Sequence, residues 1–187
     1  MQRRTPEELS RFLKAVDRHL ERPERVVIIG GAAAALHYGA QRATIDVDVA
    51  TTVSPELRSA VLRARRETGL ELPVERSGVF DAPYKYEDRL RRIEGLGLER
   101  LHAFVPEKHD LVLMKVLRSY DHDLEVIAEI HERDPLDLRT LVQRFRDEMS
   151  HVVGDQEAHR LSLVLAVERL FGEHAATATE EQLSRDR

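Results

Sequence analysis

The chain has 187 residues and a mass of 21.5 kDa, with 42% hydrophobic and 34% charged residues, a composition that excludes a disordered or membrane-embedded chain. It contains no cysteine, which excludes disulfides, thiolate zinc sites and cysteine nucleophiles. Its 29 basic and 34 acidic residues give a net charge of −5, which argues against a protein that coats DNA but is compatible with a local basic groove.

The N-terminal part of the chain predicts helix, strand and helix in succession. Residues 5–20 predict a helix, because they open with a threonine cap, a proline at the first helical position and a glutamate three residues after the cap. Residues 25–29 are apolar and β-branched, which is typical of a strand buried on both faces. Gly30-Gly31 follows, and residues 32–38 predict a short helix of mostly small residues that Gly39 closes.

The next segment continues the mixed pattern. Residues 45–49 alternate strictly and predict a strand with its three aliphatic residues on one face and its two aspartates on the other. Residues 54–68 predict a helix with a serine cap and a closing glycine. Further β-like pieces lie at 72–75 and 98–105, separated by glycine and proline.

After Pro106 the pattern becomes helical. Four helices are expected, over residues 110–118, 123–132, 135–149 and 156–171. The last of the chain is polar and rich in alanine, which favours a frayed end. We therefore expect an α/β (α+β) core with its N-terminal helix over residues 1–105, a helical portion packed on it over residues 106–172, and a disordered tail over residues 173–187.

Nothing in the chain predicts a membrane protein. No apolar run approaches the roughly 18 residues of a membrane span. The N-terminal segment lacks the apolar core of a signal peptide. We expect a cytoplasmic protein that makes no membrane contact.

Two aspartates on the strand at 45–49 suggest a metal site. Because Asp46 and Asp48 are two residues apart, a regular strand puts both carboxylates on one face, where two like charges repel each other. A divalent cation such as Mg²⁺ or Mn²⁺ relieves this repulsion and binds carboxylates together with substrate phosphates. The alternative is a solvated edge strand, on which alternating charges are common.

The residues around this strand suit a phosphate ligand. Gly30 and Gly31 let the backbone approach a phosphate closely, and the N–H groups of the helix that follows point toward the anion. Arg42 can reach the same phosphates with its guanidinium, and Thr44 can donate its hydroxyl. The alternative is a glycine-rich turn for packing alone, because a turn after a buried strand is often rich in glycine. The dinucleotide pattern G-x-G-x-x-G is absent.

The segment GGAAAALHYGAQRATIDVDV, with Gly30-Gly31 ahead of Asp46-x-Asp48, resembles the polymerase-β-like nucleotidyltransferase superfamily. More narrowly, it is similar to the minimal and AbiEii-type nucleotidyltransferases of bacteria, many of which belong to toxin–antitoxin pairs. The resemblance covers about residues 25–127. It implies a mixed sheet flanked by helices, metal binding by Asp46 and Asp48, and nucleotide contacts from Gly30, Gly31 and Arg42.

A second block, HDLVLMKVLRSYDHDLE, supports the narrower resemblance. It implies that Lys115 and Arg118 face the triphosphate and that Asp123 orients Lys115 or serves the reaction. The alternatives are that Lys115 extends from an apolar helix to solvent and that Asp123 is an acidic residue at a helix start. Spacing alone shows only that Lys115 and Arg118 share a helix face.

Many nucleotidyltransferases carry a third carboxylate on a later strand, and its identity here is open. Glu99 and His102 would lie on opposite faces of a regular strand, and Glu94 is another candidate. Together, the residues and the resemblance predict a metal-dependent enzyme that transfers a nucleotide from a nucleoside triphosphate. The resemblance implies tRNA or a protein as the acceptor and a toxin role beside a cognate antitoxin. The alternative is a degenerate nucleotide-binding or antitoxin module that acts through protein–protein interaction.

Overall fold

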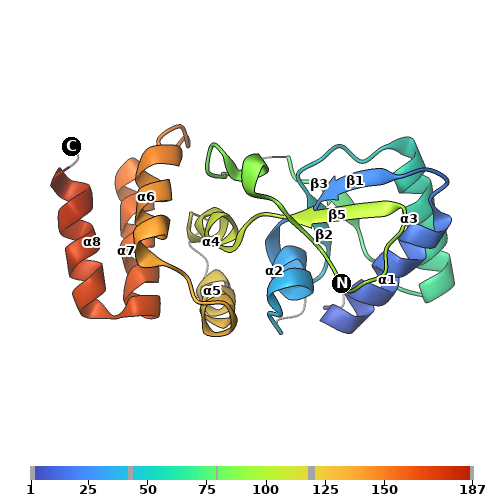
Figure 1. Ribbon diagram of the computed structural model, residues 1–187, viewed down its shortest axis with the longest axis horizontal. Helices are drawn as coiled ribbons and strands as arrows, with labels where there is room; N and C mark the ends of the chain where they lie inside the picture. The colour runs from blue at the N-terminus through green and yellow to red at the C-terminus, as the bar shows by residue number, and fades with distance from the viewer. Residues whose placement is uncertain (1–2, 42–43, 79, 118–120, 186–187) are drawn as a thin grey trace. The chain divides into compact units, whose positions relative to one another are not determined.

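The structure is a computed structural model that describes residues 3–41, 44–78, 80–117 and 121–185. It divides into two compact units, each described below by itself (Figure 1). The first unit comprises residues 1–80 and 89–106, and the second comprises residues 81–88 and 107–187.

Three helices of the first unit begin and end at local sequence signals. They are α1 (Pro6–His19), α2 (Gly30–Tyr38) and α3 (Pro55–Thr68). The predicted capping box is present, because the Thr5 hydroxyl accepts from Glu8 N–H and the Glu8 carboxylate accepts from Thr5 N–H. Gly39 and Gly69 close α2 and α3 in the left-handed conformation. These helices confirm the sequence predictions for this part of the chain.

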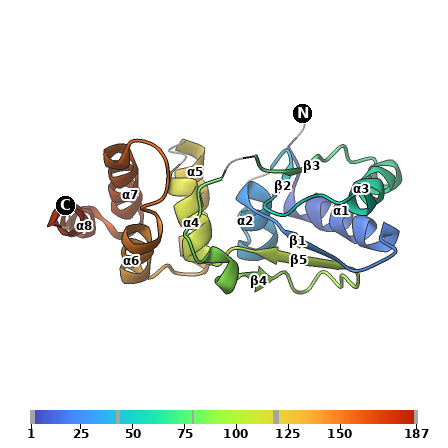
Figure 2. The same cartoon turned by 90° about the horizontal axis from the view of Figure 1, so that it is seen from above.

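The strands of the first unit pair in a mixed pattern. They are β1 (Glu24–Val27), β2 (Val47–Val49), β3 (Val74–Arg76), β4 (Arg91–Arg92) and β5 (Leu101–Val105). The short 3₁₀ helix η1 (Tyr86–Arg89) precedes β4 along the chain. Strand β1 runs parallel to β5, and β4 runs antiparallel to β5; Figure 2 shows the three side by side. Strand β2 runs parallel to β3, and an antiparallel bridge between Ile28 and Val49 joins this pair to the extension of β1.

The core of this unit lies on one side of β1 and β5, where α1 and α2 are found (Figure 1). The face of α1 that packs inward is apolar except for Asp17 and contributes Leu9, Phe12, Leu13 and Val16. Small residues of α2 let this helix approach the strands closely, and all four of its alanines are buried. The architecture is a mixed α/β fold, as expected.

The strand predicted over residues 45–49 is shorter than expected. Strand β2 begins only at Val47, so Asp46 precedes the strand and Asp48 lies within it. Val47 and Val49 are buried as predicted, but Ile45 is 41% exposed. Thr44 instead makes an antiparallel bridge with Arg4, so the backbone bends between the bridge and the strand.

A buried carboxylate of α1 holds the start of β5. Asp17 is 7% exposed, and its Oδ1 accepts the backbone N–H groups of Glu99, Arg100 and Leu101 at 3.0, 2.7 and 2.6 Å. This carboxylate therefore satisfies three backbone donors at the start of the central strand β5.

Asp17→Ala should lower the free energy of unfolding by about 3 kcal/mol, because it leaves backbone donors without an acceptor. Asp17→Asn should cost less, since the amide oxygen can still accept. Urea denaturation of both variants measures the difference. An Asp17→Ala variant as stable as the parent would contradict this role.

The second unit is helical, as predicted. Its helices are α4 (Lys108–Val116), α5 (Asp121–Arg133), α6 (Leu138–Glu148), α7 (Gln156–Phe171) and α8 (Glu173–Arg185). Helix α4 packs against α5, α6 and α7, and α8 packs along α7. Helix α7 has the predicted bounds, with Asp155 as its cap.

Two expectations for this unit are wrong. Helix α6 starts at Leu138 with Asp137 as its cap rather than at Pro135, because Asp134 instead pairs with Lys108 at 2.5 Å. The segment expected as a disordered tail forms α8 as far as Arg185. Packing is the reason, since apolar burial along α7 stabilises a segment whose propensity alone is weak.

Within the described ranges, no helix is long and apolar enough to cross a membrane.

Candidate functional site

The two glycines form the first turn of α2 rather than a separate loop before it. Helix α2 begins at Gly30, whose φ of +66° lies in the left-handed region that favours glycine. The preceding Ile29 is extended and supplies no side-chain cap, unlike the caps of α1 and α3. The first N–H groups of α2 are therefore not satisfied by a capping side chain, which suits an anionic ligand.

Strand β2 brings the predicted carboxylates to this helix start. A Cβ atom added to Gly30 would lie 3.6 Å from Asp48 Oδ2, and one added to Gly31 would lie 3.0 Å from Thr44 Oγ1. The Thr44 hydroxyl in turn donates to Asp46 Oδ1 at 3.3 Å. The structure thus gathers five of the residues predicted for the site, and all five are half-buried.

Alternation along the strands defines the face on which Asp48 lies. Val49 is 1% exposed and is bridged to Ile28, which is 0% exposed, so these two residues face the core. Asp48 precedes Val49 and lies on the opposite face. The carboxylate therefore points away from the apolar core, toward a side where a charged ligand can be accommodated.

The donors at this position fit a hard divalent cation. Asp46 and Asp48 offer carboxylate oxygens and Thr44 offers a hydroxyl, the ligand types that Mg²⁺ prefers. The absence of a side chain at Gly30 leaves the space beside Asp48 Oδ2 that a Cβ would fill. The residues present therefore fit the predicted metal, with the other coordination positions left to phosphate oxygens or water.

Gly30→Ala should destabilise the protein by roughly 1–2 kcal/mol, because an alanine is strained at this φ, and it should also weaken nucleotide binding. Gly69→Ala is a matched control, since Gly69 has nearly the same φ of +68° but no neighbour within 4 Å of its added Cβ. Thermal unfolding and triphosphate titration of both variants check this. Equal nucleotide affinity of the two variants would contradict a role for Gly30 at the site.

A third carboxylate is not apparent. Glu94 and Glu99 are both exposed, and His102 is half-buried on β5, a strand without an acidic residue. Glu75 on β3, which the sequence analysis did not consider, is the register partner of Asp48. Within the described ranges, no group of three acidic or histidine residues is arranged to hold a metal ion.

Lys115 and Asp123, both in the second unit, form a buried ion pair. Lys115 Nζ lies 2.7 Å from Asp123 Oδ1, and the side chains are 5% and 3% exposed. The alternative that Lys115 extends to solvent is therefore wrong, whereas its pairing with Asp123, one of the two roles that the resemblance implies for Asp123, is present. Asp123 Oδ2 is buried without a hydrogen-bond partner in the described part of the chain, and His122 Nε2 lies 3.9 Å from it.

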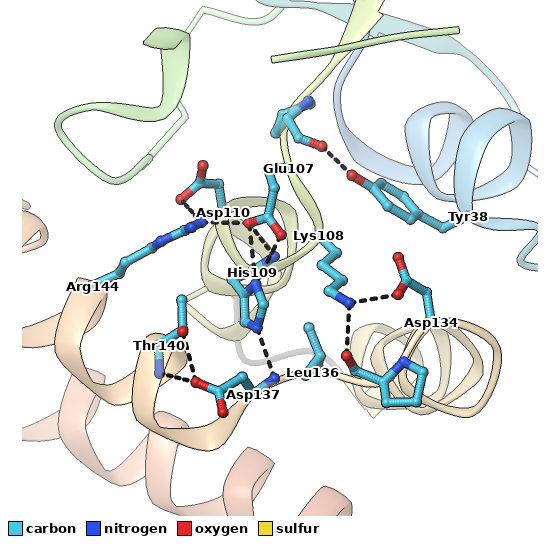
Figure 3. Close-up of polar contacts among 12 residues, drawn as sticks. Tyr38, Glu107, Lys108, His109, Asp110, Asp134, Leu136, Asp137, Thr140 and Arg144 are labelled. Carbon is cyan, nitrogen blue, oxygen red and sulfur yellow. Dashed lines mark hydrogen bonds and ion pairs between the residues drawn. The ribbon is translucent and has the colours of Figure 1, made fainter. Parts of the chain in front are cut away.

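A second buried polar cluster at the start of α4 was not predicted (Figure 3). His109 Nδ1 lies 2.9 Å from Glu107 Oε1, and His109 Nε2 accepts the backbone N–H of Asp137 at 2.8 Å. This acceptor role puts the proton on Nδ1, from which His109 donates to Glu107. Arg144 of α6 binds Glu107 and reaches Asp110 Oδ1 at 3.0 Å.

The cluster joins α4 to α6 within the second unit. No local sequence pattern predicts this cluster, because Arg144 is remote along the chain from the acids that it binds. Burial raises the pKa of Glu107, but the hydrogen bond from His109 and the guanidinium of Arg144 outweigh burial and lower that pKa to about 2. Glu107 is therefore ionised at neutral pH.

The lowered pKa of Glu107 predicts an acid-sensitive contribution to stability. A carboxyl group with a depressed folded-state pKa contributes fully above its ordinary value of 4.5, and this contribution is lost as the pH falls toward 2. Urea unfolding between pH 6 and about pH 2.5 should show a weaker pH dependence for Glu107→Gln than for the parent. The exposed Glu132→Gln serves as the control, and an identical pH profile for Glu107→Gln and the parent would contradict this prediction.

Two residues predicted for the site, Arg42 and Arg118, lie outside the described residues. The first was expected to contact phosphate beside Gly30 and Gly31, and the second to face the triphosphate together with Lys115. Both remain predictions of the sequence.

Comparison with known proteins gives a family but no individual relative. No curated protein and no solved structure matches the chain. A family model described as "Nucleotidyltransferase of unknown function (DUF6036)" matches residues 7–171. The description of this family model names neither minimal nor AbiEii-type proteins, and it does not mention toxin–antitoxin pairs. The match spans most of both units, and the chain accordingly belongs to this family of nucleotidyltransferases.

Proposed function

We propose that the protein is a metal-dependent enzyme that transfers a nucleotide from a nucleoside triphosphate to a hydroxyl acceptor. In this reaction a bond forms between the acceptor oxygen and the α-phosphorus, the bond from the α-phosphorus to the bridging oxygen breaks, and pyrophosphate leaves. The acceptor hydroxyl loses its proton to solvent or a base. The observation that supports the proposal is the convergence of Asp46, Asp48 and Thr44 on the uncapped start of α2.

Each of these residues has a distinct role in the proposal. Asp46 and Asp48 would hold the metal, and Thr44 keeps the Asp46 carboxylate in place through its hydroxyl. Gly30 and Gly31 leave room for phosphate oxygens, which the first N–H groups of α2 would bind. When bound, Mg²⁺ or Mn²⁺ would neutralise phosphate charge and activate the attacking oxygen.

The other sequence-derived roles are proposed on the resemblance alone. They are triphosphate contacts by Arg42, Lys115 and Arg118, a supporting role of Asp123, a tRNA or protein acceptor, and a toxin role opposed by an antitoxin. The burial of Lys115 and its ion pair with Asp123 are consistent with a positioned ammonium group. The toxin role predicts growth arrest on expression of the parent but not of Asp46→Ala.

Incubation with labelled triphosphates tests the proposed activity. The four triphosphates would be supplied singly with Mg²⁺ or Mn²⁺ and with either an RNA pool or a protein extract as acceptor. Label should enter one acceptor class, release one pyrophosphate per nucleotide, and stop when a chelator is added. Absence of metal-dependent transfer, with Asp46→Ala no different from the parent, would refute the activity.

The second candidate function is a degenerate module that binds a nucleotide, or a partner protein as an antitoxin would, without transfer. The lack of a three-residue acidic cluster in the described ranges favours it. Calorimetry with a triphosphate and Mg²⁺ separates the candidates when combined with the transfer assay. Tight binding without turnover on either acceptor class supports a nucleotide-binding module, and failure to bind any triphosphate supports a protein-interaction role.

A further inference from the structure

The face of the sheet that carries Asp48 also carries a group of basic and aromatic side chains that are exposed or half-buried. Alternate residues of β5 are buried, so Leu101, Ala103 and Val105 face the core while His102 and Phe104 face outward. Both outward residues are half-buried rather than covered. This side of β5 therefore presents two ring systems.

Two arginines flank these rings from the neighbouring strands. Arg25 of β1 is the register partner of His102, and its guanidinium carbon lies 5.0 Å from the centre of the Phe104 ring. Arg92 of β4 is the register partner of Phe104, and directly paired residues present their side chains on the same face. Both arginines are exposed. We call Arg25, Arg92, His102 and Phe104 the platform.

The platform and Asp48 share one face of the sheet. Val27 pairs with Phe104, and Ile28, the residue that follows β1, faces the core with its bridge partner Val49. Asp48 therefore lies on the Val27 side, two strands from Phe104, which is about 10 Å across the strands, and two residues further along. Val27 is itself buried, so it separates the platform from Asp48 on this face.

The charge of the first unit as a whole favours a polyanionic ligand. The first unit has 17 arginines and lysines against 13 aspartates and glutamates, whereas the second unit has 12 against 21. The net charge of −5 thus conceals a basic unit that contains the candidate site. An aromatic ring between two guanidinium groups can stack on a base while the cations bind flanking phosphates, which is how single strands are bound without sequence preference.

We propose that the platform binds a single-stranded polynucleotide and that this strand is the acceptor whose end reaches Asp48. The inference rests on the proposed function and names its acceptor class. A base stacks on Phe104, and Arg25 and Arg92 bind the phosphates on either side. A duplex cannot be bound in this way, because its bases are stacked on one another.

Fluorescence anisotropy with labelled 12-nucleotide RNA, DNA of the same sequence and the corresponding RNA duplex tests binding without triphosphate or metal. The parent should bind single strands more tightly than the duplex, and the RNA and DNA arms identify the sugar that is preferred. Arg25→Gln and Arg92→Gln should each weaken binding and reduce the salt slope by about one. Arg66→Gln, which changes an exposed arginine at the end of α3, should leave the binding affinity and its salt dependence unchanged.

The aromatic contact is tested separately. Phe104→Leu should weaken single-strand binding at least about fivefold with an unchanged salt slope, and Phe104→Tyr should retain binding. Unfolding midpoints of all variants would verify that each is folded. No binding by the parent, or an equal loss for Arg66→Gln and Arg92→Gln, would overturn the platform.

The transfer assay distinguishes failure of this inference from failure of the proposed function. Label transfer to protein alone, without polynucleotide binding, would overturn the platform and leave the activity intact. Polynucleotide binding that depends on Arg25, Arg92 and Phe104, without any transfer, would refute the activity and support the platform as a binding surface. Transfer to RNA or DNA that Arg92→Gln impairs through KM supports both.

Discussion

Asp46→Asn and Asp48→Asn should each lower metal-dependent nucleotide transfer by about two to three orders of magnitude. Asparagine keeps the shape of the side chain but removes the charge that binds a divalent cation. Asp48 lies beside Gly30, and Asp46 is hydrogen-bonded to Thr44, which lies beside Gly31, so removing either carboxylate should leave an incomplete ligand set. Initial rates of label transfer at several Mg²⁺ concentrations measure the loss.

Thermal unfolding gives a readout of the same site that does not depend on turnover. Mg²⁺ with a non-hydrolysable triphosphate should raise the unfolding midpoint of the parent, since a ligand that binds only the folded state stabilises it. Neither asparagine variant should respond. Glu71→Gln, which alters an exposed acid ahead of β3, should behave as the parent. A full response by both asparagine variants would refute Asp46 and Asp48 as the metal ligands.

Lys115→Met should lower the free energy of unfolding by about 3–5 kcal/mol, the second large effect that we expect. The substitution leaves the Asp123 carboxylate without its cationic partner. This carboxylate is 3% exposed and already has one oxygen without a hydrogen bond in the described part of the chain. Lys108→Met is the matched control, because its partner Asp134 is 53% exposed and such pairs contribute about 0–1 kcal/mol. Chemical denaturation of both variants provides the comparison, and similar losses would contradict the buried-pair interpretation.

The double variant Lys115→Met/Asp123→Leu separates stability from function. Replacing both charges with apolar groups should restore much of the stability, since neither ion is left unpaired. A stable double variant that has lost transfer would support a functional role for the pair. A stable variant with parental activity would limit Lys115 and Asp123 to structure.

Helix boundaries were predictable where the signal is local. The starts of α1, α3 and α7 follow a threonine, serine or aspartate cap, and each cap binds an N–H within its own first turn. The start of α6 was misplaced, although Asp134-Pro135 has the same local pattern. Asp134 binds Lys108 of α4 instead, and this competing partner is invisible in a local window.

The candidate site was predictable in its residues but not in its geometry. Gly30, Gly31, Thr44, Asp46 and Asp48 were all identified from residue type and spacing, because phosphate and metal ligands require them. Their convergence depends on the bridge between Ile28 and Val49, which joins segments separated by the helix α2. The shortened β2 and the exposed Ile45 follow from the same pairing, which alternation alone does not reveal.

The sequence by itself determined the mixed α/β order, the capped helices and the small set of residues that suit phosphate and a divalent cation, since each depends on neighbours within about one turn or strand. Only the tertiary structure decided which buried charges meet, namely Asp17 with the N–H groups at the start of β5, Lys115 with Asp123, and Glu107 with Arg144. It also decided that Arg25, Phe104 and Arg92 share a face. Strand order and register arise from pairing between remote segments, and the free energy of such pairing is not encoded in any one of them.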